Sequence, residues 1–548
     1  MTGMGDHLMI APVVLPLVAG AAMLLLGERH RGLKAAINVA STFALIGIAV
    51  ALLAMSDATS ADPAPRVGVY RLGDWPAPFG IVLVLDRLSA LMLLLTSILG
   101  AAAVVFSLAR WHRAGVHFHS LFQFLLMGVN GAFLTGDLFN LFVFFELLLA
   151  ASYGLALHGS GTARVRAGLH YIAVNLAASL LFLIGVSLIY GVSGTLNMAD
   201  LAARIPDIAA EDRPLLEAGA AILGIAFLLK SGMWPLCFWL PTTYAAASPP
   251  VASIFAILTK VGAYIVLRLW TLLFGEGAGG SAGFGGEWVL YGGMATVAFG
   301  VIGTLASQDM ARLAAYSVLV SSGTVLAGAG MGQVGVTGGA LFYMVSSTLG
   351  ISALFLLVEL VERDRDPGAD VLAVTREAYG EGEEELDPED EPGLAIPATM
   401  GMLGLAFIGC ALVIAGLPPL SGFIAKFALL TAALNPSGMT IQGGGPVRAA
   451  SWALLVLLIV SGLAALIAMT RAGIRAFWAA PDRAVPRVRV IEMAPVAALL
   501  ILCAIQAIQA GPVMRFMEAT AQSLHAPRDY VRDVLQPAEQ QARRVGGT

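Results

Sequence analysis

The sequence predicts an all-α polytopic membrane protein of about fourteen transmembrane helices. Of its 548 residues, 58% are hydrophobic and only 12% are charged, a composition unlike that of a soluble domain. Many apolar runs exceed the roughly 18–20 residues that a helix needs to cross a bilayer. Alternation with a period of two, which is typical of barrel strands, is not the dominant pattern. The chain is therefore expected to cross a membrane many times as helices.

The apolar runs and the polar stretches between them give the order of the expected spans. A polar stretch at 56–80 separates the second run from the third. A second one, at 194–214, is typical of an interfacial helix or a loop. The expected spans are 8–27, 35–55, 86–109, 119–135, 137–157, 167–192, 215–245, 249–272, 287–308, 310–330, 336–361, 395–434, 451–470 and 490–511.

Two of these spans are interrupted by proline, so they are expected to be discontinuous helices. The seventh span contains Pro235 and Pro241, and the twelfth contains Pro418 and Pro419 after Gly416. Proline removes a backbone donor and clashes with the preceding turn, and in a membrane the freed carbonyl groups must be covered by protein or water. Paired breaks in two halves of a chain are a sequence pointer to a transport site. Spans four to eight and nine to thirteen are therefore two candidate repeats.

The candidate repeats divide the chain into four expected regions. Residues 1–115 hold the first three spans, 116–275 the first repeat, 276–472 the second repeat, and 473–548 the last span and a polar C-terminal tail. The second repeat includes an acidic linker, 362–393, whose charge run is typical of a solvated cytoplasmic loop.

The basic residues of the loops predict the orientation. Loops after odd-numbered spans are richer in Arg and Lys than the others, and they include Arg29, Arg110, Arg164 and Arg475. The positive-inside rule then places these loops in the cytoplasm and both termini on the external side. Residues 1–7 contain no Lys or Arg, so the first apolar run is expected to be a true span and not a signal peptide.

Four ionisable residues lie deep inside the apolar runs: Glu146, Lys230, Lys260 and Lys426. A charge at the bilayer centre costs about 2.5 kcal/mol or more, and it is usually retained because an ion or proton path needs it. Lys230 lies beside a helix break and is a natural partner for Glu146, and a lysine shielded from water exchanges protons near neutral pH, which suits Lys260 as a relay. Two structural alternatives remain open: a static Glu146–Lys230 pair, and a Lys426 side chain that reaches the membrane interface.

Other polar residues of the spans are accessory candidates. Asp86 begins the third span and Asp137 the fifth, positions that favour a helix-end role over a relay role. His170 is the histidine clearly inside a span, and it is a candidate for proton relay.

Signals of an enzyme or a cofactor are absent from the sequence. It contains no Walker A motif and no haem or zinc spacing, and the GxGxxG match at 330–335 follows no strand. Cys237, Cys410 and Cys503 lie in apolar segments without CxxC spacing, which favours packing roles over metal or disulfide roles. We therefore expect no enzyme activity and no cofactor, while the motifs leave the place of any metal ion open.

Five motifs surround the ionisable residues and the breaks. They are GDLFNLFVFFE ending at Glu146, KSGMWPLCFWLP from Lys230 to Pro241, LTKVGAY around Lys260, AAYS at 314–317, and GLPPLSGF shortly before Lys426. Together they resemble one superfamily, which contains the antiporter-like subunits of respiratory complex I and the Mrp-type (Mnh/Pha) cation/proton antiporters. The resemblance extends over about 70–470, and the first and last motifs are most similar to the D-type subunits of the Mrp antiporters.

This resemblance implies fourteen helices, two inverted five-helix repeats and a hydrated central axis of Glu and Lys. In that scheme Glu146 and Lys230 form the input pair, Lys260 is the central relay and Lys426 is the exit. The resemblance also implies a multi-pass protein of the bacterial inner (plasma) membrane. Its partners would be subunits of the A, B, C, E, F and G types, membrane lipid, protons and Na⁺ or K⁺, with no nucleic acid.

One stretch departs from the family pattern. Many relatives carry a histidine, and often a lysine, in the eleventh span between the two halves, whereas this chain has Ser346, Ser347 and Thr348 there. Either water held by these three hydroxyl groups bridges the two halves, or the proton path does not run the full width of the chain.

The leading interpretation is a subunit of a secondary Na⁺ or K⁺/proton antiporter that conducts protons through the Glu/Lys axis. The alternative is a proton-pumping subunit of a redox complex, such as complex I or a membrane-bound hydrogenase. A third interpretation is a scaffold whose buried charges only pair helices. The scaffold predicts that exchanging the charges of Glu146 and Lys230 retains function.

Overall fold

The computed structural model describes residues 7–57, 67–115, 117–363, 398–435, 447–477 and 487–536. Within these ranges the chain forms nineteen α-helices and one two-stranded sheet. Eleven helices of the described residues are long and apolar enough to cross a membrane, and three shorter apolar helices accompany them. The predicted class, an all-α polytopic membrane protein, is therefore confirmed.

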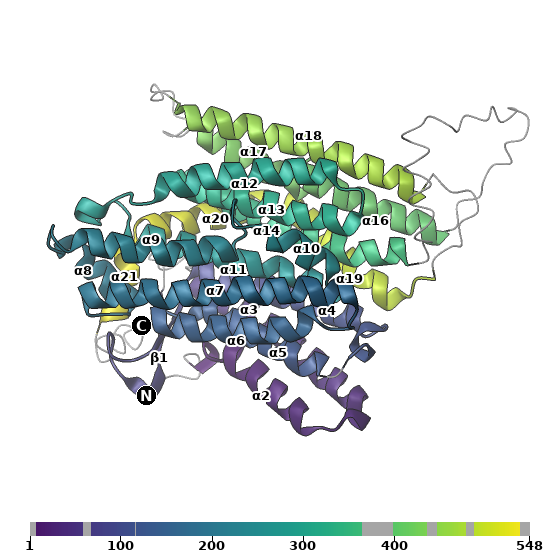
Figure 1. Cartoon of the computed structure of the whole chain (residues 1–548), viewed down its shortest axis with the longest axis horizontal. Coiled ribbons are helices and arrows are strands. Elements are labelled where there is room, and N and C mark those ends of the chain that lie inside the picture. The colour runs from purple at the N-terminus through teal and green to yellow at the C-terminus, as the bar shows by residue number, and fades with distance from the viewer. Residues whose placement is uncertain are drawn as a thin grey trace, which may run out of the picture.

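The helices follow the expected spans closely, and the long ones run side by side in one bundle with α2 at one edge and α18 at the other (Figure 1). Each expected span corresponds to one helix, or to a pair of helices for the seventh and twelfth, although the count of fourteen crossings stays a prediction. The helices are α2 (Ala11–Leu25), α3 (Arg31–Ser56), α4 (Arg87–Ser107), α5 (Phe118–Leu134), α6 (Leu138–Ala156), α7 (Thr162–Ser193), α8 (Met198–Arg204), α9 (Arg213–Lys230), α10 (Trp239–Ala246), α11 (Pro249–Leu273), α12 (Gly286–Ala306), α13 (Met310–Gly330), α14 (Val334–Glu362), α16 (Ala398–Ala415), α17 (Ser421–Leu434), α18 (Ala449–Phe477), α19 (Val490–Ile508), α20 (Ala510–His525) and α21 (Arg528–Leu535).

The two broken spans end their first halves in the same way. After α9, Gly232 has a φ of +72°, and the following residue donates its N–H to the carbonyl oxygen of Leu228 (2.9 Å). After α16, Gly416 has a φ of +76°, and the following residue donates to Leu412 (2.9 Å). Both are Schellman-type caps, in which glycine adopts the left-handed conformation without a Cβ penalty. The prediction of discontinuous helices at both places is confirmed.

The helices of the two candidate repeats have matching neighbours. In the first, α5 packs on α6, α6 on α7, and α7 on α9 and α10. In the second, α12 packs on α13, α13 on α14, and α14 on α16 and α17. The last members also match, because α11 packs on α9 and α18 packs on α16. This pattern agrees with the predicted repeats, whose residue limits remain predictions.

Two helices form the interior of the bundle. In the most apolar stretches of α11 and α14, 94% of the residues are buried. The share is 33% in peripheral helices such as α3, α16 and α19. The two are also in contact with each other, and Ser253 of α11 shares a hydrogen bond with Ser352 of α14 (2.5 Å between hydroxyl oxygens). Polar groups on α11 and α14 are therefore shielded from lipid.

The loops after odd-numbered spans meet at one end of the bundle. Glu359 pairs with Arg110 (3.4 Å) and with Arg363 (3.1 Å), and Arg363 pairs with Glu492 (2.6 Å). The indole N–H of Trp111 also donates to Glu359 (3.1 Å). These contacts gather charges that lie far apart in the sequence. Apart from its first two residues, the acidic linker predicted at 362–393 lies outside the described residues.

The opposite end carries a small sheet that both ends of the described chain reach. Strands β1 (Gly68–Arg71) and β2 (Val82–Leu85) pair antiparallel within and just after the stretch predicted to be polar. His7 contacts the hydroxyl group of Tyr70 (3.3 Å), and Arg71 donates to the carbonyl oxygen of Gln536 (2.5 Å). The beginning and the end of the described chain therefore lie on the same side of the bundle.

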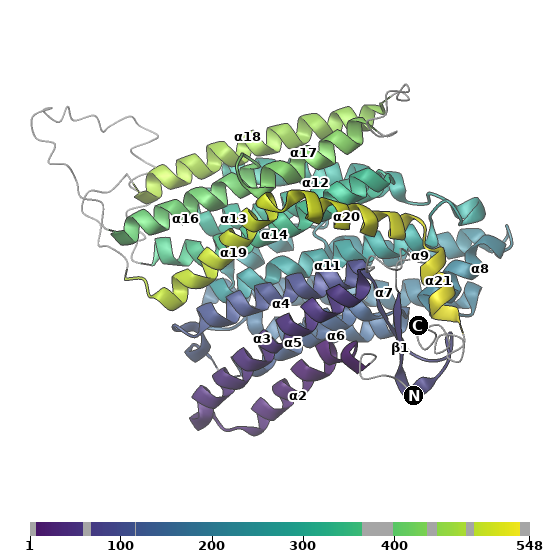
Figure 2. The same cartoon turned by 180° about the vertical axis from the view of Figure 1, so that it is seen from behind.

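The described part of the expected polar tail, as far as Gln536, is largely helical, which was not predicted from the sequence. Helices α20 and α21 follow α19 and cross the bundle from α14 toward α8 and β1 (Figure 2). The buried side chains of α20 are Met517, Thr520, Ala521 and Leu524, a spacing that gives one buried face to a helix with an otherwise polar surface. Tertiary contact with this narrow face, more than overall hydrophobicity, makes the segment helical.

Candidate functional site

Glu146 lies in the middle of α6, and its carboxylate is not fully hydrogen-bonded. The helix begins after Asp137, whose carboxylate accepts the N–H of Asn140 (2.9 Å) as an N-cap. This agrees with the predicted helix-end role of Asp137. One carboxylate oxygen of Glu146, Oε1, is buried and has no hydrogen-bond partner among the described residues. A buried polar atom without a protein partner calls for a water molecule, an ion or a functional explanation.

Lys230 is the last residue of α9 and is buried beside Glu146 without touching it. Its Nζ donates to Oδ1 of Asn175 on α7 (3.3 Å) and lies 5.5 Å from the ring centroid of Phe145. Glu146 is close enough to act on Lys230 electrostatically, but the two form no ion pair in the described part of the chain. The predicted pair is thus brought together but not in contact. Asn175, which was not predicted from the sequence, is the direct partner of the lysine.

The first helix break is stabilised by hydroxyl groups of the second repeat. Ser322 of α13 donates to the carbonyl oxygen of Ser231 (2.5 Å), and the N–H of Trp234 donates to the hydroxyl oxygen of Thr296 on α12 (2.8 Å). The residue after Trp234 is Pro235, which offers no N–H, and Pro241 lies in the first turn of α10, where the lack of an N–H costs little. These bonds tie the break beside Lys230 directly to the other half of the molecule.

Lys260 lies in the middle of α11 and is 1% exposed. Its Nζ has no hydrogen-bond partner among the described residues. The close approach of α9 to α11 occurs at Gly262, where an added Cβ would lie 2.8 Å from the N atom of Ser231. The amine is therefore buried on a helix that packs closely against the end of α9, and it has no hydrogen-bond partner among the described residues.

Lys426 lies at the second break, on α17. Its Nζ donates to the carbonyl oxygen of Ala415, the last residue of α16 (2.9 Å). Added Cβ atoms at Gly416 and Gly462 would lie 2.7 Å from Cδ and 3.3 Å from Nζ of this lysine, so both glycines make room for it. A cation at the negative end of a helix is electrostatically favoured. The lysine is buried, which rules against the alternative of a side chain that reaches the interface.

Pro418 and Pro419 lie in the turn that separates the two helices of this second break. They come one residue after Gly416, so the chain cannot continue α16 beyond its cap. The predicted place of the break is therefore confirmed at the level of single residues.

A series of serines connects the two breaks through α13 and α14. Ser322, which bonds the first break, is adjacent to Ser321, whose hydroxyl group bonds that of Ser347 (2.7 Å). The neighbouring Ser346 bonds the hydroxyl group of Ser421, the first residue of α17 (2.7 Å). The serines that stand in place of the family histidine therefore join α13 to α17 within the second repeat, and Ser322, next to Ser321, makes the contact with the first.

A small cavity adjoins this series. The cavity has a volume of about 20 Å³. On the same measure, roughly 10–15 Å³ is enough for one water molecule. Ser317, Tyr343, Ser346, Ser347 and Ser461 contribute to its lining. The hydroxyl group of Thr348 instead bonds the carbonyl oxygen of Met344 within α14 (2.5 Å). Two of the three predicted water-holding residues thus face a space of suitable size.

The remaining candidates lie apart from this arrangement. His170 is on the exposed face of α7, so the geometry offers no support for its predicted relay role. Cys237, Cys410 and Cys503 are buried and unpaired by disulfides, in line with packing roles. Within the described ranges, no group of three or more His, Cys, Asp or Glu could hold a metal ion.

Comparison with known proteins agrees with this fold and these motifs. Residues 135–445 match the family model described as NADH:quinone oxidoreductase/Mrp antiporter, TM. The chain is 61% identical over 535 residues to the D subunit of a probable K(+)/H(+) antiporter from Rhizobium meliloti (strain 1021), an alignment that covers 98% of each protein. The chain belongs to the family of Mrp-type antiporter D subunits.

Further similarities extend over the whole of this Mrp-type chain. It is 34% identical over 538 residues to the D subunit of the Na(+)/H(+) antiporter from Alkalihalophilus pseudofirmus, covering 97% of this chain and 99% of the relative. A chain in the solved structure of the Mrp complex from a Dietzia species matches it with a TM-score of 0.78 and 26% identity, covering 98% of this chain and 100% of that one. The family members are antiporter subunits, which are components of secondary transporters and not enzymes, and the predicted resemblance is confirmed.

Proposed function

We propose that this chain conducts protons within a multisubunit antiporter that exchanges monovalent cations for protons. The observation that carries the proposal is a set of three buried lysines and one half-buried glutamate inside the bundle, at or near two matching helix breaks. Two of their polar atoms, Oε1 of Glu146 and Nζ of Lys260, have no partner among the described residues. Ionisable groups are expensive inside a membrane protein, and unpaired ones contribute nothing to stability that would explain their presence.

In the proposed path, Glu146 and Lys230 receive the proton, Lys260 relays it, and Lys426 releases it. A change of charge at the first pair alters the electrostatic field at Lys260, and the resulting change at Lys260 acts on Lys426 in the same way. Each step shifts a population between charge states and requires no covalent chemistry. The hydrogen bond of Lys426 to Ala415 supports its role at the far end, because protonation strengthens that contact and deprotonation weakens it.

The serine series is the proposed bridge between the two halves. Ser322, Ser321, Ser347, Ser346 and Ser421 follow one another from the first break to the second, and the adjoining cavity has room for one water molecule. Hydroxyl groups and water can pass a proton, whereas a chain of apolar side chains cannot. This arrangement favours a path across the full width of the chain.

We infer that the loops after odd-numbered spans lie in the cytoplasm and that both termini lie outside a bacterial inner (plasma) membrane. The excess of basic residues in those loops supports this orientation. The shared position of His7 and Gln536 at β1 supports an even number of crossings. The partners are expected to be A-, B-, C-, E-, F- and G-type subunits. The 61% identity to a relative named for K⁺/H⁺ antiport favours K⁺ over Na⁺ as the exchanged cation.

The test uses everted membrane vesicles that contain the complete gene cluster in a strain without other antiporters. Adding K⁺ or Na⁺ to vesicles with a preformed pH gradient is expected to collapse the gradient. Lys260→Ala and Lys260→Arg are both expected to abolish the response, since arginine keeps the charge but does not release its proton. Thr259→Ala, a change at the neighbouring buried position, is the matched control. Intact exchange in assembled Glu146→Gln and Lys230→Ala complexes would refute the proposed path.

The redox-pump alternative predicts a different result in the same vesicles. Neither cation would then collapse the gradient, and proton uptake driven by NADH or another donor would require this chain. The identity to the D-type relatives over nearly their whole length argues for antiport.

A further inference from the structure

A polar stripe runs along α11 from Lys260 toward the end of the bundle that carries β1. Lys260, Tyr264 and Arg268 follow one another at intervals of four residues, so they lie on one face of the helix. Eight residues of helix span about 12 Å. All three side chains are buried, with exposed fractions of 1%, 3% and 6%. The proposed function uses only the first of them.

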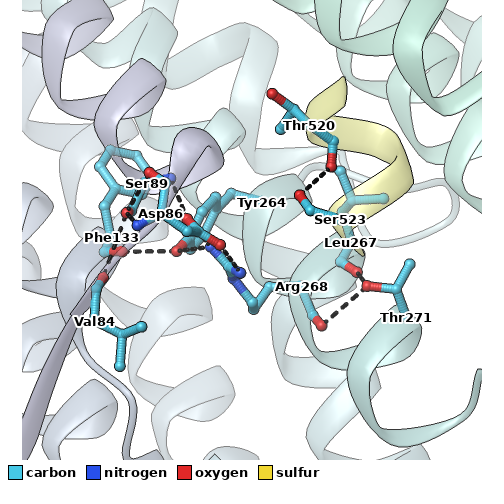
Figure 3. A network of polar contacts seen from close by, with 10 residues as sticks. All are labelled: Val84, Asp86, Ser89, Phe133, Tyr264, Leu267, Arg268, Thr271, Thr520 and Ser523. Carbon is cyan, nitrogen blue, oxygen red and sulfur yellow. Dashed lines mark hydrogen bonds and ion pairs between the residues drawn. The ribbon is translucent and has the colours of Figure 1, made fainter. Parts of the chain in front are cut away.

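The stripe ends in an ion pair that has no part in the Glu/Lys path. Figure 3 shows Asp86, Tyr264 and Arg268 pointing toward one another. Nη2 of Arg268 donates to Oδ1 of Asp86 (2.7 Å) and to the hydroxyl oxygen of Tyr264 (3.3 Å), while Nη1 pairs with Oδ2 of Asp86. The Tyr264 hydroxyl group donates to the carbonyl oxygen of Phe133 (2.7 Å). Arg268 thus connects the N-cap of α4 with Tyr264, one turn away on its own helix.

A cavity lies directly beyond this pair, under α20 and α21. Its volume is about 30 Å³, which on this measure is enough for about two water molecules. Asp86, Arg268, Ser523 and Asp529 are among the residues that line it. The ring centroid of Tyr530, on α21, lies 5.4 Å from the guanidinium carbon of Arg268. Polar groups therefore continue from the cavity to Tyr264, one helical turn from Lys260.

We propose that Tyr264, Arg268 and Asp86 form an access route by which Lys260, when the charge of the Glu146/Lys230 pair changes, takes up protons from the β1 end of the bundle. This inference rests on the proposed function of Lys260. Both Nη atoms of Arg268 are bonded to the carboxylate of Asp86, so the pair carries little net charge and does not repel an arriving proton.

The proposed transfer moves one proton and forms no bond to carbon. Water in the cavity passes a proton to the oxygen atom of Tyr264, and the hydroxyl group releases its own proton toward the neutral amine of Lys260. The amine becomes an ammonium group and the phenol is restored. The restored hydroxyl group then turns back to donate its hydrogen bond to the carbonyl oxygen of Phe133, and the route is ready for the next transfer.

A purely structural role is the alternative. Asp86 caps α4 in a reciprocal arrangement with Ser89, and its pair with Arg268 holds α4 against α11. In that role the hydroxyl group of Tyr264 only holds Arg268 and the carbonyl oxygen of Phe133 in place, and lumenal acid would not relieve its loss. Tyr264 is therefore the residue at which the two roles can be separated.

The experiment compares Tyr264→Phe with Tyr244→Phe in the complete complex, again in everted vesicles. Tyr244 is a matched control because it is also buried and also donates one hydrogen bond to a backbone carbonyl oxygen, that of Phe255 (2.9 Å). We expect Tyr264→Phe to slow cation-driven collapse of the pH gradient about ten-fold, less than the 10²–10⁴-fold typical of a lost acid–base group because water partly replaces the hydroxyl group. The control is expected to remain within about two-fold of the wild type, because its hydroxyl group lies outside the route.

A second measurement distinguishes a proton-relay role of Tyr264 from a purely structural one. If access of protons has become limiting in Tyr264→Phe, acidifying the vesicle lumen restores the rate, whereas the wild type hardly responds. Equal rates in both variants at matched complex amounts, or slowing that lumenal acid does not relieve, would overturn the route. If the wild-type complex itself fails to respond to any cation, the proposed function fails. If Lys260→Ala abolishes exchange while Tyr264→Phe does not slow it, only this inference fails.

Discussion

Nζ of Lys426 donates a hydrogen bond to the carbonyl oxygen of Ala415, across the break between α17 and α16 (2.9 Å). The lysine is thereby held against the end of a helix that stops inside the bundle. The electrostatic character of that end stabilises the ammonium form. A change that separates the two groups should therefore affect transport more than folding.

Gly462→Ala is expected to reduce exchange by separating Lys426 from Ala415. The added methyl group would lie 2.8 Å from the carbonyl oxygen of Ala415 and 3.3 Å from Nζ of Lys426, so one of them must move. Gly47→Ala on α3 is the control, because no atom lies within 4 Å of the added group. Gradient collapse is compared at equal amounts of complex, and equal rates for the two variants would contradict the expectation.

Exchanging the charges of the first pair, in Glu146→Lys with Lys230→Glu, is expected to leave the antiporter inactive. The two residues are near but not bonded, and Lys230 depends on Asn175 for its hydrogen bond. A glutamate at that position would lose the donor that Oδ1 of Asn175 needs. Gradient collapse in vesicles is the measurement, and recovery of exchange in the double variant, with both single variants inactive, would favour the scaffold interpretation.

Thr296→Val is expected to destabilise the first break. The substitution keeps the shape of the side chain but leaves the partly buried N–H of Trp234 without its acceptor, which is expected to cost about 1 kcal/mol, the lower end of the range for a buried donor. Thr304→Val on the same helix is the control, since that hydroxyl group bonds the carbonyl oxygen of Gly300 within α12. The thermal stability of the purified complex is the measurement, and equal losses in both variants would count against the role of Thr296.

Ser347→Ala is expected to slow exchange several-fold without reducing assembly. It removes the hydroxyl group that bonds Ser321 (2.7 Å) and that faces the cavity beside α14, so the bridge between the halves loses one member. Ser187→Ala on α7, where the exposed hydroxyl group bonds its own helix, serves as the control. An unchanged rate in Ser347→Ala would indicate that protons do not cross between the halves at this point.

Arg363→Ala is expected to destabilise the end of the bundle where the basic loops meet. It leaves Glu492, which is 2% exposed, without its ion-pair partner. Because Arg363 itself keeps some exposure, the loss is expected to be about 2 kcal/mol, below the 3–5 kcal/mol of a fully buried pair. The double variant with Glu492→Ala should be more stable than Arg363→Ala in thermal unfolding. If the stability losses of Arg363→Ala and Glu492→Ala simply add up in the double variant, the two residues are not coupled.

The helical class, the order of the spans and both breaks could be predicted from the sequence. A long apolar run predicts a membrane-spanning helix by its length and composition alone. Proline and glycine change the backbone locally. Neither prediction depends on contacts between distant residues. Lys260 and Glu146 were identifiable for the same reason, since an ionisable residue in an apolar run is recognisable wherever the run folds.

Partners across helices were decided by the tertiary structure alone. Asn175 beside Lys230, Arg268 beside Asp86 and the serines that join α13 to α14 are far from their partners in the sequence, and serine or asparagine in a span usually has no role beyond packing. The helical tail of α20 and α21 was missed because its narrow buried face exists only where α14 and α11 cover it.

The sequence by itself determined which segments enter the membrane and which charges are costly there. Only the packing of helices decided which groups meet those charges, because hydrogen bonds and ion pairs depend on distances that the order of residues does not contain.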